Sequence, residues 1–180
     1  MPGSYRSHVV ELKPGAPHVD SRMRRFSPTV WWLAAALTFV PYPLKAADTP
    51  YPGTIVVKTE HGFNRLVDRL ENAIAANKMG LVAQASASRG AAARGVQIPG
   101  NAVLMIFRND YAVRMLAASV AAGIEAPLRI YVTETPDGRA SLTYREPSAV
   151  FAPYRSPALD EMAKELDAVF RNIVRDAAGG

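Results

Sequence analysis

A short apolar segment near the N-terminus limits how much of this chain is available to build a fold. Residues 29–40 are almost uncharged, follow Arg24 and Arg25, and lead into small residues. A positive start, an apolar middle and a small-residue end are typical of a secretory signal peptide. We therefore predict a leader over residues 23–46, and a folded part built from residues 47–180.

Cleavage after Ala46 would place Leu44 at position −3 and Ala46 at position −1. The apolar run is shorter than the roughly 20 residues that a membrane-spanning helix needs. An uncleaved inner-membrane anchor and a buried core helix are the alternatives. The predicted location is periplasmic or secreted, with no stable membrane span after cleavage. Because Met23 directly precedes the arginines, we interpret residues 1–22 as a start-site error or a disordered extension.

Removing the leader changes the interpretation of charge. The whole chain has a net charge of +5, but residues 47–180 hold 15 basic and 14 acidic residues. A nearly neutral domain has no general attraction for phosphate backbones, so we expect no nucleic-acid partner. The chain has no cysteine, which excludes disulfides, thiol nucleophiles and cysteine-based zinc sites.

The first half of the remaining chain predicts a strand, a helix and a second strand. The β-branched run 54–59 follows a linker over 47–53 and predicts a strand. Apolar residues at helical spacing predict a helix from Phe63 through Ile74. Alternation predicts a strand over 81–88, whose inner face would be formed by Leu81, Ala83, Ala85 and Ala87.

The second half predicts a central strand, a hairpin and two helices. After a small-residue loop over 89–100, the apolar run 101–108 predicts a buried strand. A helix is predicted over 111–122, capped by Asn109 or Asp110. Its predicted inward residues are Val113, Leu116, Ala117 and Val120.

The turn Pro136–Gly138 separates two alternating runs, 128–133 and 140–144, which predict a hairpin. Ser156-Pro157 predicts the start of a final helix, with proline at its first position. We place the end of the domain at residue 176 and a disordered tail at 177–180. The element order, β-α-β-β-α-β-β-α, predicts an α+β fold in which an antiparallel sheet of four to five strands has helices packed on one face.

Several motifs in this order resemble the DUF302 family. They cover residues 54–176 and include Gly80-Leu81, Phe107-Arg108-Asn109-Asp110, Gly123-Ile124-Glu125-Ala126-Pro127-Leu128-Arg129, Asp137-Gly138 and Thr143-Tyr144-Arg145-Glu146-Pro147. The resemblance implies a TBP-like α+β fold and a possible homodimer formed through the sheet. It implies no activity, because the function of that family is not established.

The sequence departs from the family pattern at two places. Ser88-Arg89 stands where many members have an Asp-His pair, and Arg108-Asn109-Asp110 stands where many have Gly-Asn-Pro. Asn109, Pro127 and Tyr144 match the pattern. We therefore expect no metal at these positions and no cofactor.

Arginines form the main polar set that could bind a ligand. The candidate ligand-binding residues are Arg89, Arg94, Arg108, Asn109, Arg129 and Tyr144, and Arg114 belongs to the same set of arginines. Arginine forks beside a helix start can hold an anion. The alternatives are solvated arginines on scattered surfaces, a simple helix cap at Asn109 and a core-edge aromatic at Tyr144.

The folded part has one histidine, His61, which we expect to be exposed ahead of a helix. One imidazole is too few for a histidine-rich metal site, and no catalytic residue is assigned. The hypothesis is a non-enzymatic module that binds a small molecule such as an anion, or a protein. The alternative is a periplasmic enzyme such as a hydrolase.

Overall fold

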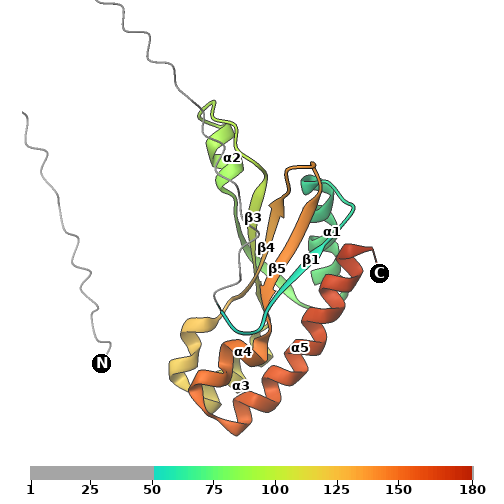
Figure 1. Ribbon diagram of the computed structural model, residues 1–180. Helices are drawn as coiled ribbons and strands as arrows, with labels where there is room; N and C mark the ends of the chain where they lie inside the picture. Colours follow the sequence, from blue (N-terminus) through green and yellow to red (C-terminus); the bar gives the residue numbers. More distant parts are fainter. Residues whose placement is uncertain (1–50, 180) are drawn as a thin grey trace, which may run out of the picture. The chain divides into compact units, whose positions relative to one another are not determined.

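The computed structural model describes residues 51–179, which form a five-stranded antiparallel sheet with helices packed against it (Figure 1). The predicted leader, the segment before it and the linker up to residue 50 lie outside the described residues. The elements are β1 (Thr54–Lys58), α1 (Phe63–Ala76), β2 (Gly80–Ala85), α2 (Ala87–Ala92), β3 (Asn101–Phe107), α3 (Asn109–Ala118), η1 (Val120–Glu125), β4 (Leu128–Glu134), β5 (Ala140–Arg145), α4 (Pro147–Phe151), η2 (Ala152–Tyr154) and α5 (Pro157–Ala178). Within residues 51–179, no helix combines the length and apolar character that crossing a membrane requires.

The strands lie in the order β1-β5-β4-β3-β2, and every neighbouring pair is antiparallel. The predicted hairpin is confirmed: β4 pairs with β5 from Glu134 opposite Ala140 to Ile130 opposite Tyr144. The turn between them is closed by a hydrogen bond from the Thr135 amide to the Arg139 carbonyl (2.7 Å). The first strand, β1, adds to the outer side of β5 and forms one edge of the sheet.

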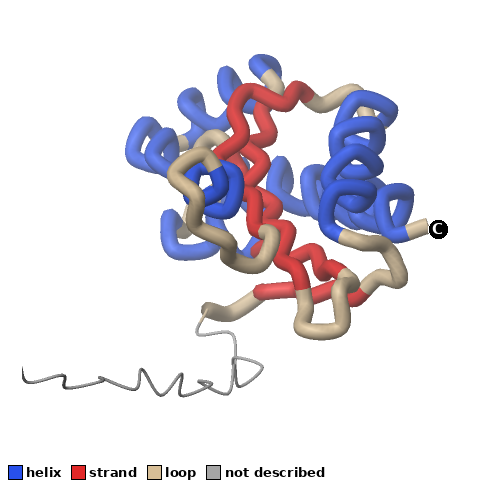
Figure 2. Tube along the Cα trace, turned by 90° about the horizontal axis from the view of Figure 1, so that it is seen from above, coloured by secondary structure: helices blue, strands red, loops and turns tan. Residues whose placement is uncertain are grey.

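Helices α1 and α5 cover one face of the sheet, and the main core lies beneath them. Figure 2 shows the helix that leads to the C-terminus lying, with its neighbour, on one side of the strands. The sheet contributes alternate residues to this core, because successive side chains of a strand point to opposite faces. Those buried against the helices include Ala102, Leu104, Ile106, Ile130, Val132 and Leu142.

The final helix has the predicted apolar stripe. Leu159, Met162, Leu166, Phe170 and Ile173 are almost completely buried, at the spacing of one helix face. The helix begins at Pro157 as predicted and continues through Ala178. Residues 177 and 178, which the sequence analysis placed in a disordered tail, therefore belong to its last turn. Arg69 of α1 donates hydrogen bonds to the carbonyl oxygens of Asp176 (2.8 Å) and Ala177 (2.6 Å), which helps to satisfy that helix end.

The predicted inner face of the second strand is wrong. A bulge between Leu81 and Ala83 shifts the register, so Leu81 pairs with inward-facing Ile106 while Ala83 pairs with outward-facing Met105. The inserted residue reverses the alternation that the sequence suggested. The strand also ends at Ala85, because Ser86 caps α2 by accepting a hydrogen bond from the Arg89 amide (3.2 Å).

The predicted bounds, cap and inward residues of the third helix are also wrong. Helix α3 begins at Asn109, its N-cap position is Arg108, and no side chain among residues 51–179 caps it. The Asp110 carboxylate instead accepts a hydrogen bond from the Arg108 guanidinium (2.7 Å). Residues 120–122, predicted to continue the helix, all belong instead to a separate 3₁₀ helix, η1.

Helix α3 buries Met115, with Tyr111 and Ala118 packed against the core. The residues predicted to face inward are exposed instead: Val113 is 60% exposed and Val120 is 79% exposed. Contact with α5 and the core selects the side of the helix that carries Tyr111, Met115 and Ala118 as its buried face. The sequence analysis also missed α4 and η2, which lie between β5 and α5.

Candidate functional site on the open face of the sheet

The face of the sheet opposite α1 and α5 carries the site. Outward-facing Val56 and Tyr131 are 49% and 40% exposed, so this face is open in the part of the chain that the structure describes. Tyr131 pairs with Thr143 on β5 and with Val103 on β3, which places these three side chains in one row across the sheet.

Two arginines occupy the next row on the same face. Tyr144 of β5 pairs with Ile130 of β4, and both are buried on the inner face. Continuing the antiparallel register by one residue places Arg145 beside Arg129, and alternation turns both outward. Like charges directly opposite each other destabilise an antiparallel pair. This local conflict suggests that the pair serves something other than stability.

Neither guanidinium is neutralised by a neighbour. Among residues 51–179, Arg129 and Arg145 have no carboxylate oxygen within 4.0 Å. Arg145 is held by other contacts: its Nη2 donates a hydrogen bond to the Ala149 carbonyl (3.2 Å), and its guanidinium carbon lies 5.4 Å from the centre of the Tyr51 ring. The Arg145 Nε is buried and has no hydrogen-bond partner within the described part of the chain. A buried donor of this kind is costly unless something accepts its hydrogen bond.

A cavity of about 380 Å³ lies beside these two arginines. This volume falls in the range of small-molecule sites. The cavity is formed by the ends of β4 and β5 together with residues before β1, at the end of η1 and on α4. Its lining residues are Tyr51, Thr54, Val103, Glu125, Leu128, Arg129, Tyr131, Thr143, Tyr144, Arg145 and Val150.

Glu125 is the acidic residue among those that line the cavity. Its Oε1 accepts a hydrogen bond from the Tyr154 hydroxyl (2.9 Å). The pKa of Tyr154 is raised, first by loss of solvation and then by this hydrogen bond to the carboxylate. Glu125 therefore has a partner of its own, and the formal charge of the lining is two arginines against one glutamate.

Two of the predicted site residues, Arg129 and Tyr144, line this cavity. Tyr144 belongs mainly to the core: it is 5% exposed and its ring centre lies 5.9 Å from that of Phe170. Loss of solvation on burial, followed by the charge of Glu146, raises its pKa. Arg129 thus contributes charge to the cavity, whereas Tyr144 contributes part of its wall.

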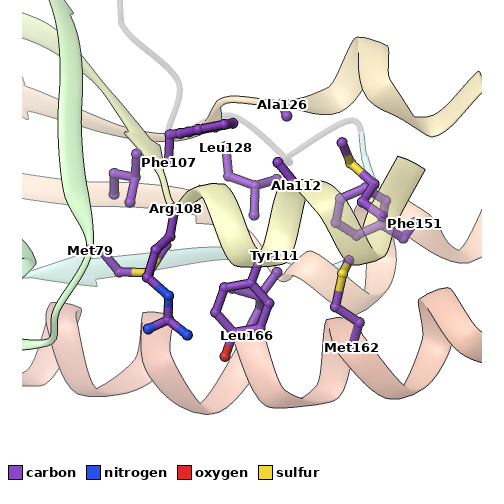
Figure 3. A pocket seen from close by; sticks show the side chains of 12 residues that line it. Met79, Phe107, Arg108, Tyr111, Ala112, Ala126, Leu128, Phe151, Met162 and Leu166 are labelled. Atoms are coloured by element: carbon purple, nitrogen blue, oxygen red, sulfur yellow. The ribbon is translucent and has the colours of Figure 1, made fainter. Parts of the chain in front are cut away.

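Arg108 lies instead beside a much smaller hollow between α3 and α5 (Figure 3). Its volume is about 30 Å³, which is room for about one water molecule. The Arg108 guanidinium lies 4.3 Å from the centre of the Tyr111 ring and forms an ion pair with Asp110 (2.7 Å). The hydrogen bond between the Arg108 and Asp110 side chains is the largest cause of the raised pKa of Arg108 and of the lowered pKa of Asp110. Asn109 is the first residue of α3 beside this pair.

The remaining predicted arginines lie elsewhere. Arg89 and Arg94 are exposed on and after α2, at the end of the sheet where β3 begins, whereas α3 follows the other end of β3 (Figure 1). The seven residues of β3 separate these two ends by about 20 Å. Arg114 forms a bidentate ion pair with Glu165 (2.7 and 2.8 Å). The predicted set of arginines is therefore not one cluster.

Sequence reasoning missed Arg145 as a site residue. The pattern that could have found it is the predicted hairpin itself. Pairing across the Pro136–Gly138 turn aligns residue 134 with residue 140, so counting outward along both strands brings Arg129 opposite Arg145. The approach of Tyr51 and Val150 to the same place depends on tertiary packing and has no comparable local pattern.

The single histidine of the folded part is not exposed as predicted. His61 is half-buried, and its Nε2 is shielded without a hydrogen-bond partner among the described residues. This nitrogen lies close to Gly179, because α5 ends beside the loop that carries His61. Within residues 51–179, no group of three histidine, aspartate or glutamate side chains could hold a metal ion.

Comparison with known proteins identifies the family of this chain and a solved structure with the same fold. The family model "Domain of unknown function DUF302" matches residues 55–177. The chain belongs to the DUF302 family. A solved structure, the crystal structure of an uncharacterised conserved DUF302 protein from Bacillus stearothermophilus, is 19% identical in sequence, with a TM-score of 0.63. That comparison covers 70% of this chain and 98% of the other, and it shows the shared fold. A comparison with curated proteins gives no match.

Proposed function

We propose that this protein is an exported, non-enzymatic module that binds a small anionic ligand in the cavity on the open sheet face. The observation that carries the proposal is the pair Arg129 and Arg145, which face one cavity without an acidic partner among residues 51–179. An anion between them would relieve their repulsion and accept hydrogen bonds from the two guanidinium groups.

The chemistry of the lining favours binding. Arginine stays protonated at any working pH, so it donates hydrogen bonds but does not act as a base. The glutamate in the lining is engaged by the Tyr154 hydroxyl. His61 lies on the loop before α1, beside the end of α5, and is not among the lining residues. These features support a ligand-binding role over a hydrolytic one.

The proposed export rests on the sequence of residues 23–46. A positive start, an apolar run and small residues at its end support a cleaved leader. Intact-mass analysis of the protein isolated from its native host tests this point. A chain that begins at Ala47 supports export, and a chain that still carries Trp31 and Trp32 contradicts cleavage.

Thermal unfolding of the purified protein with added anions tests the ligand site. We expect acetate, benzoate or phosphate at millimolar concentration to raise the melting temperature, because a ligand that binds only the folded state stabilises it by RT ln(1 + L/Kd), where L is the free ligand concentration. Arg129→Gln is expected to remove most of this rise. Arg94→Gln is the matched control, because it removes the same charge from an exposed position near α2.

Two results would contradict the proposal. The first is a melting temperature that no anion raises beyond the effect of equal ionic strength from sodium chloride. The second is an equal loss of the anion effect in Arg129→Gln and Arg94→Gln, because a general charge effect would then explain it.

A further inference from the structure

The walls of the open-face cavity are mostly apolar, although the formal net charge of the lining residues is positive. Val103, Leu128 and Val150 line it together with Tyr51, Tyr131 and Tyr144. A fully hydrated ion such as phosphate gains little from such walls, because burying a polar group without matching hydrogen bonds costs free energy. A ligand with an apolar body would instead remove these side chains and its own surface from water.

Two of the tyrosines present their rings to the cavity from different elements. Tyr131 projects from β4 on the open face and is 40% exposed, while Tyr51 precedes β1 and is 61% exposed. The Tyr51 ring lies against the Arg145 guanidinium. Aromatic side chains favour offset or edge-to-face contact with another ring. Exposed rings beside a cavity therefore suit a flat partner.

The charge of the lining matches a single negative charge. Arg129 and Arg145 contribute two positive charges and Glu125 contributes one negative charge. A monoanion would balance the remaining charge, whereas a second negative group on the ligand would face the Glu125 carboxylate. A carboxylate also offers two oxygens in the geometry that guanidinium forks bind.

We propose that the ligand is an aromatic monocarboxylate, bound with its carboxylate at Arg129 and Arg145 and its ring among Tyr51, Tyr131 and Val103. This inference rests on the proposed function and names the chemical class of its ligand. The carboxylate accepts hydrogen bonds from the two guanidiniums. The ring replaces water over the row of side chains formed by Val103, Tyr131 and Thr143 on the open face.

Isothermal titration calorimetry of the purified protein with four probes tests this assignment. The probes are benzoate, acetate, phosphate and benzamide, which separate the ring from the charge. We expect benzoate to bind at least tenfold more tightly than acetate or phosphate, because the ring adds buried apolar surface. Benzamide keeps the ring but lacks the charge, so we expect it to bind at least tenfold more weakly than benzoate.

Two variants locate the two halves of the ligand. Tyr131→Ala is expected to weaken benzoate binding while leaving acetate binding unchanged, because it removes only a ring contact. Arg129→Gln is expected to weaken both by at least tenfold, and Arg94→Gln is expected to weaken neither. Tyr131 is a suitable position because its side chain stands on the open face and outside the core.

The outcomes separate this inference from the proposed function. If acetate or phosphate binds as tightly as benzoate and Arg129→Gln abolishes the binding of that anion, the proposed anion site is supported. The proposed aromatic class of the ligand is then wrong. If benzamide matches benzoate, the charge is not recognised and both proposals fail. If none of the four binds, both are also overturned. If Tyr131→Ala weakens benzoate and acetate equally, Tyr131 makes no specific contact with the ring and the proposed ring position is wrong.

Discussion

Replacement of Arg129 by glutamine should stabilise the free protein while it removes ligand binding. The two arginines lie beside each other on neighbouring strands, and neither is paired with a carboxylate among residues 51–179. Arg129 is the better one to change, because Arg145 also donates a hydrogen bond to Ala149. Removing the charge at residue 129 therefore relieves repulsion with little loss of structure.

The size of the effect follows from Coulomb's law. Guanidinium groups on opposite cross-strand positions are separated by about 7 Å, and in a dielectric of about 80 their repulsion is about 0.6 kcal/mol. This value lies within the range of about 0.2–1 kcal/mol known for cross-strand pairs. For a domain of this size, it corresponds to a rise of about 2–3 °C in melting temperature.

Thermal unfolding of the purified protein at low and high sodium chloride measures this effect. We expect Arg129→Gln to melt above the wild type at about 10 mM salt. The difference should almost disappear at about 1 M salt, where the screening length is about 3 Å. Arg94→Gln controls for the change in net charge and should show a smaller rise. A lower melting temperature for Arg129→Gln, or a rise that salt does not reduce, would refute the reasoning.

Three further predictions concern the folded domain around the site: its core, the attachment of α4 and the turn between β4 and β5. Phe170→Ala should destabilise the protein by about 3–5 kcal/mol in urea unfolding, because it empties a fully buried position in the core; a loss below about 1 kcal/mol would contradict this packing. Asp167→Ala should cost about 1–3 kcal/mol in the same assay, because the Asp167 carboxylate accepts the Ser148 amide hydrogen bond (2.9 Å) that holds α4 beside the cavity. Thr135→Val should raise the pKa of Asp137, measured by carbon-13 NMR, because the Thr135 hydroxyl is the largest cause of its depression. A depressed carboxyl pKa stabilises the fold above the ordinary value of 3.8, so that contribution is lost as the pH falls below about 4, and an unchanged pKa in the variant would count against the hydrogen bond.

The elements that the sequence predicted well are those whose signals are local. The hairpin has alternating strands on both sides of a turn with proline, aspartate and glycine, and its strands pair in the expected register. The final helix repeats apolar residues over several turns, so its buried face is determined by its own periodicity.

The predictions failed where one residue changes a local pattern. The bulge between Leu81 and Ala83 exchanges the two faces of β2, and nothing in the alanine-rich alternation indicates it. In α3, a short apolar segment offered more than one possible inward face. Contact with α5 and the sheet selected Met115 and left Val113 exposed.

The residues of the candidate site also divide into those placed by local sequence signals and those placed by tertiary packing. Residues that the hairpin places together can be derived by counting from its turn, and this includes Arg129 and Arg145. The other walls come from Tyr51, Glu125 and Val150, which are far apart in the sequence and meet only when the domain folds.

The sequence alone determined the class of fold, the strand alternation and the lack of cysteine chemistry, because these depend on residue type and short-range spacing. Tertiary structure decided which arginines share a cavity and which form ion pairs with neighbouring carboxylates such as Asp110 and Glu165. The physical reason is that charge pairing depends on distances of a few ångströms. Only the packing of separate elements sets those distances.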